Sequence, residues 1–164
     1  MRACSERGFT YLGLLILLAI IGIASAASLQ AGAALQRRAA EEELLDIGMA
    51  FRNALLSYAN ATPVGQKRAP SSLQDLLKDP RYPNPRRHLR KLYADPLTGK
   101  EEWGVIEAQD GGGIIGVYSL SNARPIKTGN FATAFQDFAG KTSYREWRFM
   151  AVPQIIPPVN APVK

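Results

Sequence analysis

The densest run of charge in the sequence lies at residues 86–91, where Arg86, Arg87, His88, Arg90 and Lys91 follow one another closely. Guanidinium and ammonium groups donate strong hydrogen bonds to phosphate and carboxylate oxygens. Lys and Arg number 20 against 14 Asp and Glu, a balance that favours anionic partners in general. We therefore regard Arg86, Arg87, Arg90 and Lys91 as candidate anion-binding residues. A solvated helix surface is the competing interpretation.

Other reactive chemistry has little support in the sequence. Cys4 is the one cysteine and His88 the one histidine, so neither a disulfide framework nor a zinc site of Cys and His ligands can form. The glycines at 111–113 lack the helix and lysine that follow them in phosphate-binding loops. We find no nucleophile beside a base and no pair of carboxylates near a cleft motif, and we expect neither a cofactor nor an enzymatic activity.

A strongly apolar stretch, RGFTYLGLLILLAIIGIA, occupies residues 7–24, and no charged residue occurs from Gly8 to Gln36. Residues 9–29 would form a helix about 31 Å long at about 1.5 Å per residue, which matches the hydrocarbon thickness of a bilayer. The stretch therefore predicts a membrane-spanning helix.

Three processing routes fit this stretch. In the first, Arg2 and Arg7 precede the apolar core of a signal peptide, and Ala24-Ser25-Ala26 is an A-x-A cleavage site that releases a periplasmic binding domain. In the second, the stretch is an uncleaved single-pass anchor. The third depends on the junction Arg7-Gly8-Phe9-Thr10, where a short polar leader meets the apolar run directly.

That junction resembles the class III signal of type IV pilins and type II secretion pseudopilins. The resemblance implies that prepilin peptidase cleaves between Gly8 and Phe9 and methylates the new amino group of Phe9. The protein would then be a single-pass inner-membrane protein with a cytoplasmic amino terminus and a periplasmic head, and it could be extracted into a periplasmic filament. The implied partners are other pilin-like subunits, the peptidase, an inner-membrane assembly platform and membrane lipid.

One position departs from the family pattern. The family usually has a glutamate five residues into the mature chain, where it pairs with the amino terminus of a neighbouring subunit, and here that position is Gly13. An unpaired buried charge is costly. Some minor members of the family lack this glutamate, so the resemblance implies that Gly13 marks a minor or specialised subunit.

The helical pattern continues beyond the apolar stretch to about residue 59. Apolar or small residues recur at spacings of three and four, which puts them on one face: Leu44, Gly48, Phe51, Leu55 and Tyr58. On the other side, Arg37 and Arg38 precede Glu41 and Glu42 by four residues, a spacing that predicts solvated surface ion pairs.

The head should begin with short helices. Ser72 with Asp75, or Ser71 with Gln74, has the spacing of a capping box, and Asp79-Pro80 should end the helix that it opens. A second short helix is expected at residues 84–92, with Asn84 as cap and Pro85 in the first turn.

A small sheet should follow. Residues 103–106 and 114–120 read as a β-hairpin across the glycines at 111–113, and 145–152 as a third strand. Phe131, Phe135 and Phe138 are expected in the core, together with Leu55, Leu76 and Trp103.

These elements predict an α+β, pilin-like fold, in which a long amino-terminal helix packs on a small antiparallel sheet. The expected organisation is a leader (1–8), a transmembrane and assembly helix (9–33), a periplasmic head (34–152) and a Pro-rich extended tail (153–164). The head resembles that of the pseudopilin G group, whose major members bind calcium in a loop after the second strand. The matching residues 119–130 contain no carboxylate, so no metal site is expected.

Two functions remain beside the released binding domain. The first is a subunit of a type II secretion or type IV pilus-like filament. The second is a DNA-binding minor pilin of an uptake apparatus, in which residues 86–91 would contact nucleic acid.

Overall fold

The computed structural model describes residues 7–109 and 111–151, with the backbone alone for residues 7–10 and 24–31. The chain divides into two compact units, Met1–Ala39 and Ala40–Lys164. Most of the expected leader and the Pro-rich tail at 153–164 lie outside the described residues. The described part combines one long helix with a small antiparallel sheet, which confirms the α+β class.

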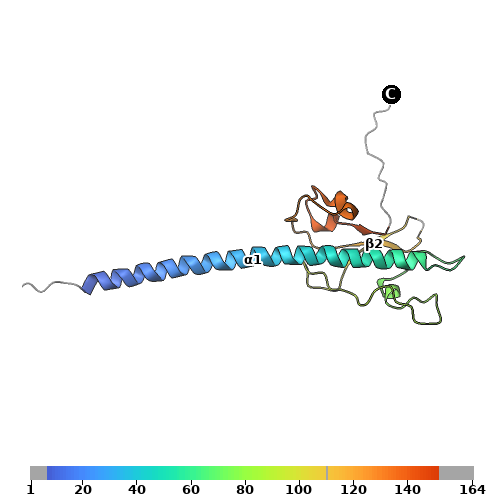
Figure 1. Ribbon diagram of the computed structural model, residues 1–164, viewed down its shortest axis with the longest axis horizontal. Coiled ribbons are helices and arrows are strands. Elements are labelled where there is room, and N and C mark those ends of the chain that lie inside the picture. Colours follow the sequence, from blue (N-terminus) through green and yellow to red (C-terminus); the bar gives the residue numbers. More distant parts are fainter. Residues whose placement is uncertain (1–6, 110, 152–164) are drawn as a thin grey trace, which may run out of the picture. The chain divides into compact units, whose positions relative to one another are not determined.

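Helix α1 covers Arg7–Asn60, close to the predicted 9–59 (Figure 1). No proline interrupts this range, and the first one that follows is Pro63. After the last turn, Ala61 N donates to Ser57 O at 3.0 Å and Thr62 Oγ1 donates to Tyr58 O at 3.2 Å. These bonds satisfy carbonyls that the end of a helix leaves without partners.

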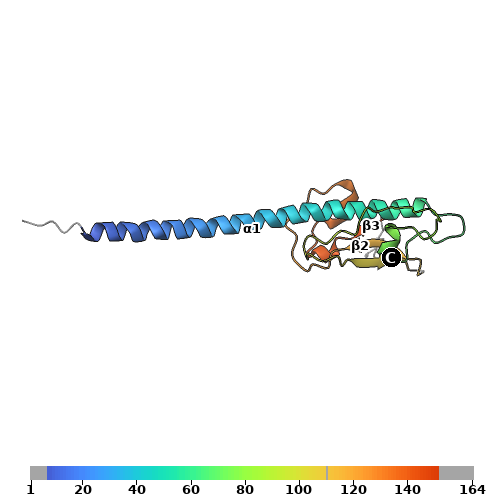
Figure 2. The same ribbon diagram turned by 90° about the horizontal axis from the view of Figure 1, so that it is seen from below.

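Within the second unit, the predicted face of α1 is buried, and this prediction is confirmed. Leu44, Phe51, Leu55 and Tyr58 are at most 3% exposed, and Gly48 is buried beside them. Figure 2 shows the sheet lying along the carboxyl-terminal part of α1. The helix therefore forms one layer of the head and the sheet the other.

The sheet has three antiparallel strands in the order β1-β2-β3: β1 is Gly104–Glu107, β2 is Ile114–Tyr118 and β3 is Phe149–Met150. The β1–β2 hairpin was predicted. The third strand is shorter than the predicted 145–152, because the 3-10 turn η3 (Tyr144–Glu146) occupies its start. Ser143 caps that turn by accepting a hydrogen bond from Arg145 N.

An aromatic cluster fills the space between the layers. The 3-10 segment η2 (Thr133–Phe138) supplies Phe135 and Phe138, which stack on each other with ring centroids 5.1 Å apart. Trp147 stacks on Phe138 at 5.2 Å, and Phe149 meets the same ring edge-on. Leu55, Leu76, Trp103 and Phe135 are all buried, as predicted.

The first short helix has the predicted position and cap. Segment η1 (Leu73–Leu76) is a single 3-10 turn that opens with a capping box between Ser72 and Asp75. The Asp75 carboxylate accepts hydrogen bonds from both Ser71 N and Ser72 N, so the Ser72 alternative is the one that forms.

The second short helix, predicted at 84–92, does not form. The structure assigns no helix there, because the backbone makes tertiary hydrogen bonds instead. His88 N and Leu89 N both donate to Leu76 O, at 2.8 and 2.9 Å, and Asp79 N donates to Arg86 O at 2.9 Å. The segment lies against the end of η1 and is held in an irregular conformation by these bonds.

The prediction that Glu41 lies on a solvated face of the helix is also wrong. Glu41 is 4% exposed, and its carboxylate accepts hydrogen bonds from Ile126 N, Lys127 N and the Tyr144 hydroxyl at 2.8, 2.9 and 2.5 Å. Those partners lie more than 80 residues further along the chain, so the spacing from Arg37 could not indicate them.

Candidate functional site

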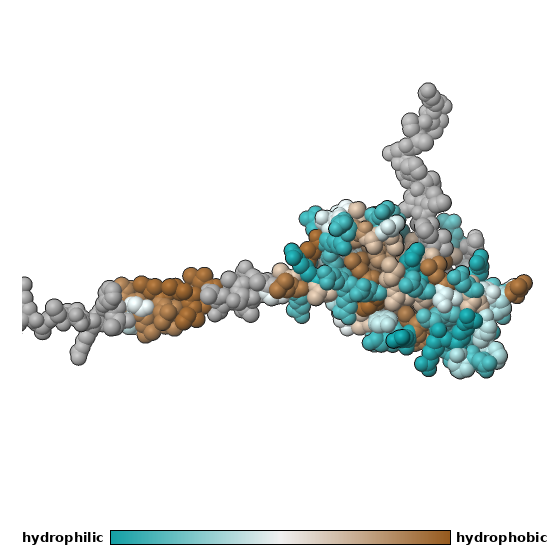
Figure 3. All heavy atoms as spheres, in the orientation of Figure 1, coloured by the Kyte–Doolittle hydropathy of each residue, from teal (hydrophilic) through white to brown (hydrophobic). Residues whose placement is uncertain are grey.

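The amino-terminal part of α1 presents an exposed apolar surface. The large apolar side chains from Tyr11 to Ile23 are each 44 to 73% exposed. They occur at nearly consecutive positions and so face all directions around the helix, and Figure 3 shows a mostly brown surface on the visible face of this segment. Such a surface is costly in water and typical of contact with lipid or with other apolar helices. Among the helices that the structure describes, none combines the length and apolar character needed to cross a membrane.

Three candidate residues belong to this part of α1. Gly8 and Phe9 lie in its first turns, where only the backbone is described. Gly13 lies two residues into the exposed segment, and a Cβ built on it meets nothing within 4 Å. A longer side chain at position 13 would therefore fit without a clash inside the described subunit.

The basic segment is exposed although it is not helical. Arg86, Arg87, Arg90 and Lys91 are all solvent-exposed. Arg86 lies over the Tyr82 ring with Cζ 5.0 Å from its centroid, and Lys91 lies over the Tyr93 ring with Nζ at 5.2 Å. These two cations are therefore held by cation–π contacts on the head's own aromatic rings.

Arg87 and Arg90 line a surface pocket of about 410 Å³ together with Leu77, Lys78 and Pro85. Lys78 is a member of the site that the sequence pattern did not single out. It lies two residues after the end of η1, and the backbone hydrogen bonds from residues 88 and 89 to Leu76 bring it beside the basic segment. Only this tertiary pairing unites the three cations.

His88 differs from its basic neighbours because its side chain is only 1% exposed. Its Nε2 lies 3.2 Å from Asp79 Oδ2, and its Nδ1 lies 2.8 Å from Ser57 Oγ. The order serine, histidine, aspartate matches that of a hydrolytic triad, but such a triad also needs donors that stabilise an oxyanion. Ser57 lies inside α1, where backbone N–H groups are used by the helix itself. The arrangement joins α1 to the basic segment, and we refer to Ser57, His88 and Asp79 as the clasp.

Asp79 is the centre of this clasp. It forms a two-point ion pair with Arg81, from Nε to Oδ1 at 2.8 Å and from Nη2 to Oδ2 at 2.6 Å, and neither side chain is more than 6% exposed. The hydrogen bond from the Arg81 guanidinium lowers the pKa of Asp79 to about 2. The carboxylate is therefore ionised at any pH near neutrality.

Arg81 also closes the carboxyl-terminal end of α1. Its remaining N–H groups donate to Tyr58 O at 2.9 Å, Thr62 Oγ1 at 2.8 Å and Lys67 O at 3.1 Å, and its Cζ lies 3.5 Å from the centroid of the Tyr58 ring. A cation at this end of a helix interacts favourably with the helix dipole. Arg81 thus joins the helix, the following loop and Asp79.

The burial of Asp79 and Asp95 was not predicted, although each residue lies in an Asp-Pro pair, which is a local turn signal. Each aspartate precedes a proline and accepts a hydrogen bond at 2.9 Å from the backbone N–H two residues later, on Arg81 and Leu97. Asp-Pro is a typical start of such turns. Asp95 Oδ2 also accepts a hydrogen bond from Ser119 Oγ at 2.7 Å, which links this turn to the residue that follows β2.

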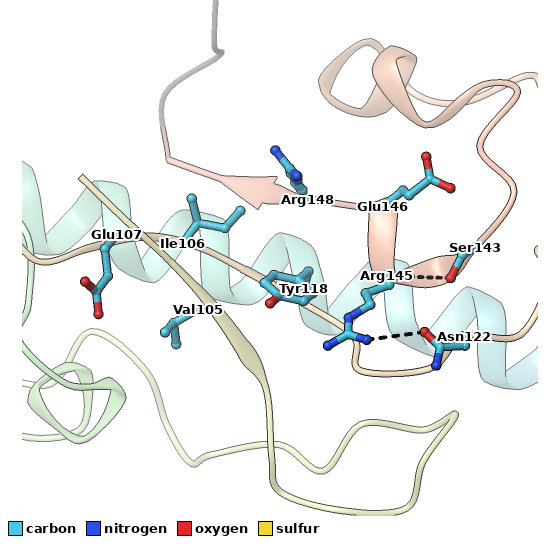
Figure 4. Close-up of a pocket in the computed structure, with 9 residues that line it drawn as sticks. All are labelled: Val105, Ile106, Glu107, Tyr118, Asn122, Ser143, Arg145, Glu146 and Arg148. Atoms are coloured by element: carbon cyan, nitrogen blue, oxygen red, sulfur yellow. Dashed lines mark hydrogen bonds between the residues drawn. The ribbon is translucent and has the colours of Figure 1, made fainter. Parts of the chain in front are cut away.

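A larger pocket of about 630 Å³ lies on the sheet (Figure 4). Its lining includes Tyr118 in the centre, Arg148 and Arg145 on different sides of that ring, and the carboxylates of Glu107 and Glu146 at its borders. Because these charges have opposite signs, the pocket favours neither an anion nor a cation. Among the described residues, no group of three or more His, Cys, Asp and Glu is placed to hold a metal ion.

No protein-family model matches the chain, and neither a curated protein sequence nor a solved structure matches it.

Proposed function

We propose that this protein is a pilin-like subunit, of a minor or specialised pseudopilin type, in a type II secretion or type IV pilus-like filament. One observation carries the proposal. A single helix, α1, has an apolar segment exposed on all sides, and further along it has a face that forms the core of the head. This division suits a subunit whose helix packs against other helices while its head faces water.

The sequence at the start of α1 supports the same role. Cleavage of the bond between Gly8 and Phe9 would leave the apolar segment at the new amino terminus, as the resemblance to prepilins implies. Residues 9–29 would then be held in the inner membrane, with the head in the periplasm, until assembly. This part of the proposal depends on the sequence of residues 9–29 and on the junction before it.

The proposed partners are pilin-like subunits, prepilin peptidase, the assembly platform and lipid. The role is structural and not enzymatic, since the clasp of Ser57, His88 and Asp79 has no oxyanion donors within α1. A pseudopilin with a carboxylate-rich loop would use calcium to hold that loop. In this chain, the loop at 126–127 is instead held by the Glu41 carboxylate through two backbone N–H groups.

The test is the mass of the mature amino terminus, measured by mass spectrometry on protein purified from membranes of a host with an active prepilin peptidase. We expect a chain that begins with N-methylated Phe9. The Gly8→Leu variant should keep the leader, because a bulky residue next to the scissile bond blocks processing. A chain that begins at Ala27 would refute the proposal and favour secretion as a released domain.

A further inference from the structure

We infer that the pocket formed by Lys78, Arg87 and Arg90 binds a compact phosphate-bearing ligand, either a phospholipid headgroup or a soluble phosphate ester. The inference does not depend on the proposed function. It starts from the position of three cations around one pocket of about 410 Å³.

All three cationic groups are available to a ligand. Within the described part of the chain, the side chains of Lys78, Arg87 and Arg90 form no ion pair and no hydrogen bond, and none of the residues lining the pocket is acidic. Each guanidinium can donate two parallel hydrogen bonds to a phosphate, and the ammonium adds a third charge.

The backbone that carries these groups is held in place before any ligand arrives. Leu76 O accepts hydrogen bonds from His88 N and Leu89 N, and the buried His88 ring contacts both Asp79 and Ser57. Leu89 itself is 5% exposed and belongs to the core. Arg87 and Arg90 thus flank an anchored pair of residues, so ligand binding needs little ordering of the main chain.

The arrangement favours a compact anion over nucleic acid. Proteins that bind single strands combine a long basic groove with aromatic rings that stack on the bases. Here the rings of Tyr82 and Tyr93 already have Arg86 and Lys91 of the basic segment over them. The three remaining cations line one pocket, and the other two residues that line it, Leu77 and Pro85, are apolar.

The test uses the full chain in non-ionic detergent micelles, titrated with inorganic pyrophosphate in a calorimeter. The double variant Arg87→Gln/Arg90→Gln should weaken binding about tenfold or more, because it removes two charged donor groups from the pocket. The control is Lys100→Gln/Arg148→Gln, which changes the net charge equally at exposed residues outside the pocket. It should leave the Kd within about twofold of the parent.

Short-chain phosphatidylglycerol added to the micelles, compared with phosphatidylcholine, separates the two sources of phosphate. Binding of phosphatidylglycerol that pyrophosphate displaces identifies a lipid headgroup, whereas binding of pyrophosphate alone identifies a soluble ester. The inference is overturned if pyrophosphate does not bind, or if the two double variants weaken binding equally. It is also overturned if duplex DNA binds through Arg87 and Arg90 and pyrophosphate fails to displace it.

Discussion

The Tyr144 hydroxyl donates a 2.5 Å hydrogen bond to Glu41 Oε2, and so joins η3 to helix α1 across 103 residues of sequence. Both side chains are buried, with exposed fractions of 1% and 4%. The same carboxylate accepts the N–H groups of Ile126 and Lys127. One buried acidic residue thus fixes the loop after β2 and the turn before β3 against the helix.

Glu41→Gln should lower the free energy of unfolding by about 2–3 kcal/mol, because an amide NH₂ group would face a backbone donor and leave it unpaired. The measurement is chemical denaturation of the full chain in detergent, followed by tryptophan fluorescence. Glu42→Gln, at the exposed neighbouring position, is the matched control and should change stability little. Equal effects of the two variants would contradict the role assigned to Glu41.

Gly48→Ala should destabilise the head by about 2 kcal/mol, even though alanine is the better helix former. A Cβ on Gly48 would overlap the ring of Phe149, which is itself fully buried in β3. The second variant Gly48→Ala/Phe149→Leu should recover part of the loss, measured by the same denaturation. Gly32→Ala is the control, since a methyl group at that position of α1 would meet nothing within 4 Å.

Local sequence patterns predicted the buried face of α1, which includes Gly48, but did not predict the conformation of the basic segment. The face of α1 and the capping box of Ser72 and Asp75 depend on residues three or four apart, and both were predicted correctly. At 84–92, Asn84 and Pro85 are equally good local signals for a helix. No helix forms there, because Leu76 O accepts hydrogen bonds from two backbone N–H groups of that segment and His88 is buried against Asp79.

Buried charge was the least predictable feature. Glu41 contacts Lys127 across 86 residues, and no local pattern marks such a pairing. The pocket of Lys78, Arg87 and Arg90 was predicted only in part, because Lys78 joins it through the fold. Asp79 and Asp95 could have been found from their Asp-Pro signals, although their burial could not.

Asp79→Asn should cost about 3 kcal/mol at neutral pH, because it leaves the Arg81 guanidinium buried beside a neutral amide. The pKa of Asp79 is lowered from 3.8 to about 2 in the folded protein. Because the folded pKa is lowered, the ionised carboxylate contributes its full stabilisation at pH values above the unfolded pKa. This stabilisation is lost as the pH falls from about 4 towards about 2. The stability difference between parent and variant should therefore narrow over that range.

The prediction is checked by measuring unfolding midpoints at several pH values between about 5 and about 2. This range includes both the unfolded and the folded pKa of Asp79. Asp137→Asn, at an exposed position of η2, is the matched control and should change stability little. A difference between parent and Asp79→Asn that stays constant down to the lowest pH would contradict the ion-pair account.

The last prediction concerns the effect of Gly13 on filament assembly, and it depends on the proposed function. In an assembled filament, an amino terminus buried without a carboxylate partner would cost several kcal/mol. This chain should therefore form homopolymers poorly and should join filaments made by subunits that carry the glutamate. Gly13→Glu should form filaments more readily, because it supplies the carboxylate that pairs with the amino terminus, and a Cβ at this position meets nothing within 4 Å in the single subunit.

The measurement is electron microscopy of filaments sheared from cells that overproduce the protein alone, together with its genomic neighbours, or as the Gly13→Glu variant. Filaments are expected with the neighbours or with the variant. Gly13→Gln is the matched control, since it has the same size as glutamate without the charge that pairs with an amine. Abundant filaments from the unaltered protein alone would refute the minor-subunit assignment, and filaments from Gly13→Gln would show that side-chain size, and not charge, limits assembly.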